Sequence, residues 1–276
     1  MFGQKILLDY NMSGCYYHKH YTLPKGNYDT SIDCTYVLLM VGSEREEQIL
    51  EQIKNAEITT DVILQYNHGY KKCDKNLRVN KPNYDLEHAC KTIFKHALNS
   101  GFKRIIVLED DCEFDERIRD EKVIKDINTF LNRKNPDIYN LGTTLSLSSP
   151  IDILLHEDHH LLLYNTCSHA TIYSEKYMKH GLTHDFLLGH SDFETNRHMS
   201  KYTYKFPIAY QKIVETENAK EGWGYTWPVL NTLMVSPLRL HEKVQPGFDR
   251  LKMTFDYISV LLCLLLIYII KRKTRL

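Results

Sequence analysis

A short apolar run that ends in three consecutive acids constrains this chain more than any other feature. Residues 105–108 read Ile-Ile-Val-Leu, and Glu109, Asp110 and Asp111 follow directly. The run predicts a short strand buried in a sheet. Like charges at the end of a buried strand repel one another, and desolvation penalises each of them. A divalent cation would relieve both costs, and oxygen ligands favour Mn2+ or Mg2+ over zinc. The same residues also fit a solvated acidic turn.

Strand-like and helix-like segments alternate between residue 35 and residue 142. The apolar pattern predicts strands at 35–41, 61–66, 105–108 and 137–141, and helices at 44–55, 86–98 and 117–132. Ser43 is placed to cap the first of these helices. Such alternation is typical of α/β folds, in which ligands bind at the carboxyl ends of parallel strands. We therefore expect a mostly parallel central sheet with the three acids at one end.

The remainder of the chain is less regular. Beyond Pro150 the pattern predicts strands at 161–164, 170–173 and 204–206, and helices at 175–180 and 192–200. Residues 1–34 are rich in Tyr and His with little periodicity, and we expect an irregular leader. Hydrophobic content of 43% and charged content of 25% are ordinary for a globular domain. We place that domain at residues 35–250.

The charge balance argues against nucleic-acid binding. Lys+Arg and Asp+Glu are both 35, so the formal net charge is zero. The body of the chain has no block of arginines and no basic-aromatic stretch of the kind that tracks a phosphate backbone.

The seven cysteines predict neither a zinc site nor a redox motif. Their number is odd, they are scattered, and none forms a C-x-x-C pair. A chain of this length does not need disulfides to fold, and several of these thiols stand in apolar runs. From the cysteines we expect a reducing compartment.

The C-terminal segment, residues 251–276, predicts a membrane anchor. Residues 257–270 carry no charge, and a basic cluster follows at 271–275. An uncharged run of about 14 residues is shorter than the roughly 20 that span a bilayer comfortably, although Phe255 and Met253 extend it. The basic cluster suits an anionic headgroup layer. A buried C-terminal helix is the alternative, and the side of the membrane stays open.

The order of these parts resembles glycosyltransferase family 25, which includes lipopolysaccharide and collagen galactosyltransferases. The strand at 36–41 followed by Ser43-Glu44-Arg45, and the acid-tipped strand with its Leu108-Glu109-Asp110-Asp111, are similar to the family's motifs. Residues 168–174 and 206–211 look like two of its later segments. The resemblance implies a GT-A fold and a metal-dependent enzyme. Such an enzyme transfers a hexose (galactose or glucose) from a nucleotide sugar, which the resemblance implies is UDP-linked, to a hydroxyl of a glycan, lipid or protein.

The resemblance and the chemistry assign roles around the acids. We expect Asp111 to bind the metal, with help from Glu109 or Asp110. Alternation in an extended segment puts Glu109 and Asp111 on one side. Asp110 then points the other way, towards a ribose hydroxyl or a structural partner. Arg45 could bind the donor diphosphate, or could be an exposed helix residue. His169 could complete the metal shell, or could be a packed strand histidine.

Transfer by single displacement with inversion also needs a general base. By resemblance this is Asp192, at the head of the helix expected at 192–200. Capping of that helix is the alternative role for Asp192.

Two departures from the family pattern keep a second reading open. Met40-Val41-Gly42-Ser43 stand where the family has Asn-Leu before a basic pair, and Cys90-Lys91 stand near its Ser-His. The chain could therefore be an inactive, membrane-attached binding or scaffold protein. A phosphotransferase or hydrolase metal site is a third reading of the acids. The cluster His156-Glu157-Asp158-His159-His160 is contiguous, so its side chains do not converge, and we expect a solvated turn there.

Overall fold

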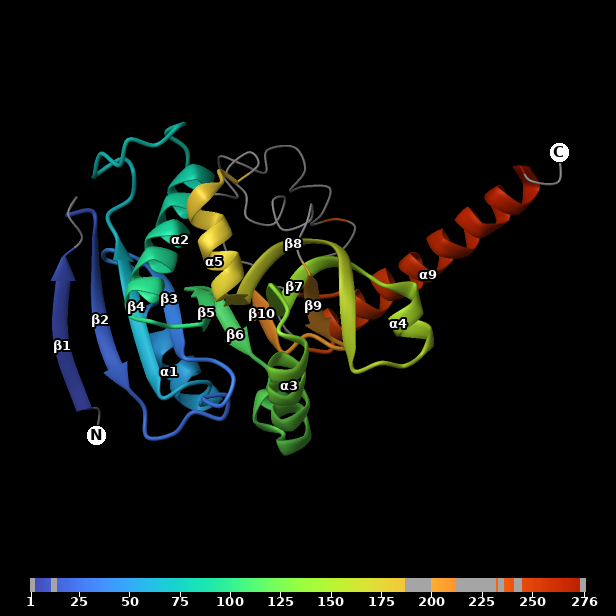
Figure 1. Cartoon of the computed structure of the whole chain (residues 1–276), viewed down its shortest axis with the longest axis horizontal. Helices are drawn as coiled ribbons and strands as arrows, with labels where there is room; N and C mark the ends of the chain where they lie inside the picture. The colour runs from blue at the N-terminus through green and yellow to red at the C-terminus, as the bar shows by residue number, and fades with distance from the viewer. Residues whose placement is uncertain are drawn as a thin grey trace.

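The central feature of the computed structural model is a twisted eight-stranded sheet (Figure 1). The structure describes residues 3–10, 14–186, 200–211, 232, 236–240 and 245–273. The strands of the large sheet are, in spatial order, β1 (Gly3–Tyr10), β2 (Tyr16–Thr22), β4 (Asp61–Asn67), β3 (Cys34–Met40), β5 (Arg104–Glu109), β8 (His159–Ser174), β7 (Ile138–Ser148) and β9 (Lys201–Tyr204). A separate two-stranded ribbon pairs β6 (Cys112–Phe114) with β10 (Ala209–Gln211) in antiparallel register.

The sheet is mixed, so the expectation of a mostly parallel sheet is corrected. Its centre is parallel, because β3 pairs in parallel with both β4 and β5. The β1–β2, β2–β4, β5–β8 and β7–β8 pairs are all antiparallel. The physical reason lies in the connections: β7 returns as β8 through a short segment, whereas parallel neighbours need a crossover of a dozen or more residues.

Helices cover both faces of the parallel centre (Figure 1). α1 (Glu46–Ala56) and α3 (Glu121–Lys134) pack on one face, where Ile106 and Leu108 of β5 point. α2 (Pro82–Asn99) and α5 (Glu175–Thr183) pack on the other face, against Ile105 and Val107. The buried strand predicted at 105–108 is thus confirmed, because alternate side chains enter two different cores.

The segment expected to be an irregular leader contains two strands. β2 pairs with β4 along its whole length, and β1 forms the outer edge of the sheet. The sequence Tyr16–Thr22 is dominated by Tyr, His and Thr, and aromatic and β-branched residues favour strands once a neighbouring strand is available. That neighbour lies about 45 residues further along the chain, so local periodicity gave no indication of it.

A disulfide joins Cys15 to Cys73, which lies 58 residues further along the chain. It ties the start of β2 to the loop that leads from β4 into α2. A disulfide is typical of an oxidising compartment, whereas the cysteine pattern led us to expect a reducing one. Two cysteines so distant in sequence form no spacing motif, so the pattern did not indicate this bond.

The last helix, α9 (Gly247–Lys273), extends away from the body of the molecule (Figure 1). It is long and apolar enough to cross a membrane, and only 6% of its most apolar stretch is buried. Its first turns pack on the body through Phe248 and Leu251, whereas the side chains from Leu264 to Ile270 are exposed. The structure therefore does not bear out the alternative of a buried C-terminal helix.

Candidate functional site

The three acids lie where β5 ends, at the edge of the sheet where the parallel strands have their carboxyl ends. β5 ends at Glu109, and Asp110 and Asp111 form a turn that leads into β6. β3 is the parallel neighbour of β5, so the loop after β3 reaches the same edge. This edge is where open α/β sheets bind ligands.

Asp110 is held by the loop that follows β3. Arg45 Nη1 lies 3.1 Å from Asp110 Oδ1, and Ser43 Oγ donates to Asp110 Oδ2 at 3.1 Å. Ser43 Oγ also accepts from the Arg45 backbone N–H at 3.3 Å, and α1 begins after Arg45 without a side-chain cap. Ser43 therefore positions Arg45 and Asp110 instead of capping the helix as predicted. Asp110 has the structural partner that was one of its two expected roles.

Asp111 is a buried carboxylate with one oxygen in use. Its side chain is only 5% exposed, and Gln211 Nε2 donates to Oδ2 at 3.1 Å. Oδ1 is buried and has no hydrogen-bond partner among the residues that the structure describes. Burial raises the pKa of Asp111 to about 6, and the charge of Asp110 adds to this shift, although Gln211 and Arg45 oppose it. An acid held in this state gains from any cation that reaches its open oxygen.

Glu109 is the last residue of β5, and Asp111 lies in the turn that follows it. Strand alternation places Glu109 on the same side of β5 as Ile105 and Val107, which pack towards α2 and α5. Asp111 instead bonds to β10, whose Ala209 packs in the core with Ile106 and Leu108. The strand ends at Glu109, and a turn does not preserve the two-residue period.

Within the described residues, no three His, Cys, Asp or Glu side chains form a group that could hold a metal ion. A three-residue shell of Asp111, Glu109 and His169 is therefore not assembled there. Mg2+-type ions are also bound by one or two carboxylates together with substrate phosphates and water. The open Asp111 Oδ1 fits that arrangement, and its metal role stays a prediction.

His169 is a buried residue of β8, close to the ribbon that holds Asp111. Its neighbour Gly142 on β7 explains the close packing. A Cβ on Gly142 would lie 2.1 Å from the Ala209 carbonyl oxygen and 2.4 Å from His169 Nε2. Only glycine lets β10 approach β7 here, and β10 carries Gln211 to Asp111.

Gly142→Ala is accordingly expected to destabilise the protein by about 1–3 kcal/mol, since the added methyl overpacks a site bounded by backbone. Chemical denaturation of the full chain in detergent measures this loss. Ala209 must move for the methyl to fit, so the variant should also weaken any ligand binding that depends on Asp111. An unfolding midpoint equal to that of the wild type would contradict the close approach of β7 and β10.

The ribbon is also fastened to the start of α9. Asp115, just after β6, accepts from Arg117 Nε at 2.7 Å and from the Tyr210 hydroxyl. Arg117 Nη2 also donates to Asp249 of α9 at 3.0 Å. Burial opposes ionisation of Asp115, but the hydrogen bonds from Arg117 and Tyr210 outweigh it and lower its pKa to about 2. The turn that bears Asp111 is thus connected to the C-terminal helix.

The remaining sequence candidates separate into two groups. Asp192, the predicted base, lies outside the described residues. In the histidine cluster, His156 and Glu157 are exposed around a turn, as expected, whereas His159 and His160 begin β8 and are packed. His159 stacks on Phe130 with ring centroids 4.0 Å apart, and its Nδ1 lies 2.9 Å from the Tyr139 hydroxyl.

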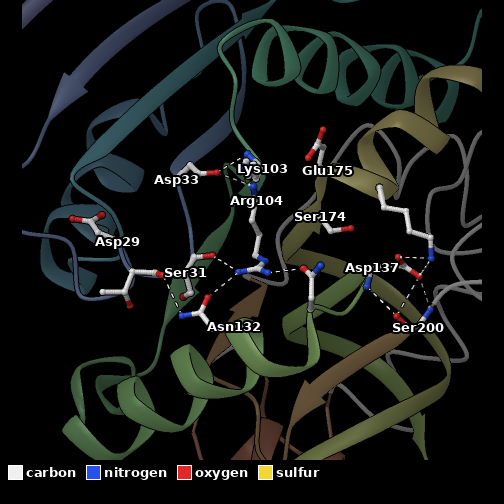
Figure 2. Close-up of a pocket in the computed structure, with 13 residues that line it drawn as sticks. Asp29, Ser31, Asp33, Lys103, Arg104, Asn132, Asp137, Ser174, Glu175 and Ser200 are labelled. Carbon is white, nitrogen blue, oxygen red and sulfur yellow. Dashed lines mark hydrogen bonds and ion pairs between the residues drawn. The ribbon is translucent and has the colours of Figure 1, made fainter.

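A pocket of about 590 Å³ lies at the opposite edge of the sheet (Figure 2). Asp33 and Arg104 stand there at the amino ends of β3 and β5. The polar groups in it largely bond to one another: Asp33 Oδ2 accepts from the Arg104 backbone N–H at 2.8 Å, and the Arg104 guanidinium donates to the Ser31 carbonyl at 2.6 Å. Asp137 is bound by Lys176 and Ser200. We regard this network as structural, because it fixes the loops at the amino ends of the strands.

Comparison with known proteins gives a limited picture. No protein-family model matches the sequence, and no curated protein matches it. Among solved structures, the chain is similar to A197 from STIV, with 14% identity, a TM-score of 0.36, and coverage of 67% of this chain and 86% of A197. It is also similar to HddC from Yersinia pseudotuberculosis, with 16% identity, a TM-score of 0.35, and coverage of 67% and 76%. At these scores the similarity carries no argument about function.

Proposed function

We propose that the chain is a metal-dependent glycosyltransferase attached to a membrane by α9. It would move galactose or glucose from a nucleotide sugar, UDP-linked by resemblance, to a hydroxyl of a glycan, lipid or protein. The observation that carries the proposal is Asp111, a buried carboxylate with an open oxygen at the carboxyl end of the central strand β5. The ordered resemblance to glycosyltransferase family 25 supports the same site.

In this proposal Asp111 would hold a Mn2+ or Mg2+ ion, and Gln211 keeps its carboxylate in place by donating to Oδ2. The ion, when bound, neutralises charge on the diphosphate leaving group. Metal binding requires an ionised carboxylate at this position, whereas folding stability favours a neutral side chain because the site is buried. A functional requirement would therefore explain why a carboxylate is present where burial raises its pKa.

Arg45 and Asp110 form the second part of the donor site. Asp110 and Ser43 fix the Arg45 side chain at the rim of the acidic turn, and the guanidinium is about one-third exposed. A guanidinium has five N–H donors, so one that is bound to a carboxylate can still meet a phosphate. Glu109 is assigned to donor binding by resemblance, and Asp192 is assigned by resemblance to proton removal from the acceptor hydroxyl.

Calorimetric titration of the full chain in detergent with UDP, UDP-glucose and UDP-galactose tests the proposal, with and without Mn2+. We expect binding that requires the metal, that is lost in Asp111→Asn, and that persists in Asp158→Asn. Asp158 is a suitable control because it forms a surface ion pair with Lys205. Equal binding with and without Mn2+ would exclude the metal role. No binding by a folded sample would favour a different donor or the inactive alternative.

The alternative is an inactive, membrane-attached binding or scaffold protein. A specific observation favours it: at the place where the family resemblance implies Ser-His, Cys90 packs in the core and Lys91 pairs with Glu87 and Asp185 at 2.9 Å each. These side chains take part in core packing and in ion pairs that do not involve the acidic turn. Absence of nucleotide binding together with a normal unfolding transition would support this alternative.

A further inference from the structure

An exposed apolar surface stands beside the base of α9. The short helix α4 (Pro150–Leu154), which connects β7 to β8, and the residue after it expose Ile151, Leu154 and Leu155 by 65%, 61% and 66%. Leu163, on the adjoining part of β8, is 52% exposed. Contiguous exposed aliphatic side chains are uncommon on a surface that meets only water.

The polar side chains of this segment bond to the body of the protein, and the apolar side chains are therefore left exposed to solvent. Ser149 caps α4 by accepting from the Asp152 backbone N–H at 3.4 Å. Asp152 accepts from the Leu161 backbone N–H of β8 at 2.7 Å. α4 is therefore attached to the protein through its hydrophilic groups and presents its hydrophobic ones, which reverses the usual arrangement of a surface helix.

Hydrogen bonds set the level of α4 along α9. Ser259 Oγ donates to the Ser148 carbonyl oxygen at 2.5 Å, and Ser148 lies immediately before the segment that contains α4. The uncharged run of α9 begins at Tyr257, two residues before Ser259. α4 contacts α9 and thus lies at the level where α9 becomes uncharged (Figure 1).

The last two charged residues of α9 before that run, Lys252 and Asp256, form an ion pair beside β7. Lys252 Nζ lies 2.5 Å from Asp256 Oδ1 and donates to Ser148 Oγ at 3.0 Å. The helix therefore enters its uncharged run without an unpaired charge from this pair. The run of 14 residues is about 21 Å long at 1.5 Å per residue, which is less than the roughly 30 Å of a hydrocarbon core. A short span favours a body that lies close against the bilayer.

We propose that Ile151, Leu154 and Leu155 insert into the boundary between headgroups and acyl chains of the bilayer that α9 crosses. This inference rests on the proposed membrane attachment by α9. The continuity of the α4 surface with the exposed apolar surface of α9 identifies the occupant as lipid. Two contacts, the α9 span and α4, would fix the tilt of the domain at the membrane, whereas a single helix would leave it free to rotate.

Site-specific labelling of the full chain in phosphatidylcholine vesicles tests the proposal. The environment-sensitive dye NBD is attached at Leu154→Cys, at Leu266→Cys in α9, or at Glu51→Cys on the exposed face of α1, each in a Cys263→Ser background. Phosphatidylcholine carrying a nitroxide on its acyl chain is then the quencher. We expect strong quenching and blue-shifted emission at positions 154 and 266, and neither at position 51. The labelled Cys263→Ser parent gives the background.

The outcomes separate the two proposals. Quenching at 266 without quenching at 154 would overturn the α4 inference and leave the membrane anchor in place. No quenching at either position would overturn both. A blue shift at 154 without quenching, accompanied by crosslinking of two chains through Leu154→Cys, would show that a second copy covers this surface and would also overturn the inference.

A second variant gives an energetic readout. The variant combines Ile151→Ser, Leu154→Ser and Leu155→Ser. Its vesicle binding is compared with that of the protein without these three substitutions, and both proteins carry Leu265→Arg, which weakens insertion of α9. Loss of three exposed aliphatic side chains is expected to reduce vesicle partitioning about tenfold or more. Because all three side chains are exposed, the substitutions should leave the unfolding midpoint unchanged. Equal partitioning of the two proteins would contradict the insertion of α4.

Discussion

Replacing Asp111 with asparagine is expected to abolish hexose transfer and, at neutral pH, to stabilise the unliganded protein. Transfer should fall at least about a hundredfold, because asparagine has the same shape but cannot balance the charge of a metal–diphosphate complex. The stability effect follows from burial, which raises the pKa of Asp111 from 3.8 to about 6. The ionised form present at pH 7.5 is therefore disfavoured in the folded state.

The stabilising effect of Asp111→Asn is expected only above the pH at which Asp111 begins to ionise in the unfolded chain. Because the folded-state pKa lies above the unfolded value, the contribution of Asp111 to stability is fully present below about pH 4. It is lost as the pH rises through 6. Below pH 4, protonated Asp111 and asparagine each bury a neutral polar group, so wild type and variant should be about equally stable. At pH 7.5 the variant should be more stable by on the order of 2–3 kcal/mol, or about 5 °C in Tm.

Asp115→Asn is a matched control of opposite sign. Asp115 lies four residues further along the same ribbon; burial opposes its ionisation, but Arg117 and Tyr210 lower its pKa to about 2. A lowered folded-state pKa gives stability that is present above pH 4 and is lost as the pH falls towards 2. Asp115→Asn should therefore destabilise the protein at pH 7.5 by about 1–2 kcal/mol, after allowance for solvent screening of this partly exposed cluster.

Thermal unfolding of the three proteins from pH 2 to 8, without metal, measures both effects, and a sugar-transfer assay with Mn2+ measures function. The proposal requires that activity and stability change in opposite directions in Asp111→Asn. A variant that is inactive and also less stable at pH 7.5 would show that Asp111 supports the fold, and full activity would exclude it from the site.

The parallel centre of the fold could be predicted because its signals are local. The helix expected at 44–55 is observed as Glu46–Ala56, and the helix expected at 86–98 as Pro82–Asn99. Ser174 caps α5 by accepting from the Tyr177 backbone N–H, as the short helix predicted at 175–180 requires. Each of these elements follows from apolar periodicity or a cap within a few residues.

The antiparallel part was hidden because its strands depend on distant partners. Residues 161–164 and 170–173 were predicted as separate strands, whereas β8 runs continuously from His159 to Ser174. The polar stretch between them interrupts the apolar pattern, but it pairs with β7, with Asn165 opposite Ser146 and Ser168 opposite Thr143. A partner strand satisfies backbone groups whatever the side chains are, and local pattern does not report it.

The candidate site shows the same division. The strand that leads to the acids was predicted, whereas the ion pair between Arg45 and Asp110 was not. The role of Ser43 was not, since its bond to Asp110 joins residues 67 positions apart. Gln211 donates to Asp111 across 100 positions of sequence, and this bond depends on the close approach of β10 to β7 that Gly142 permits. Such contacts arise from tertiary packing, so only the structure could reveal them.

Replacing Lys75 with methionine is expected to cause the largest loss of stability among the substitutions considered. The Lys75 side chain is 0% exposed, and its ammonium donates to Asp85 and Asn67. It also lies 4.7 Å from the centre of the Tyr16 ring. Burial lowers the pKa of Lys75, although Asp85 opposes this shift. Methionine keeps much of the side-chain volume but leaves Asp85 as a buried charge without a cation, which costs about 3–5 kcal/mol.

Two further variants distinguish a lost ion pair from general damage. Lys25→Met removes an exposed pair with Glu57 and should change stability by less than about 1 kcal/mol. Adding Asp85→Asn to Lys75→Met should recover most of the loss, because the double variant no longer buries an unpaired charge. The asparagine oxygen can still accept the hydrogen bond that the Tyr70 backbone N–H donates to Asp85 at 3.0 Å. Denaturant unfolding in detergent measures all of these proteins. A double variant as unstable as Lys75→Met would locate the loss in packing around Tyr16. The Cys15–Cys73 disulfide holds the same loop covalently in every variant, so the differences report the ion pair and not the closure of the loop.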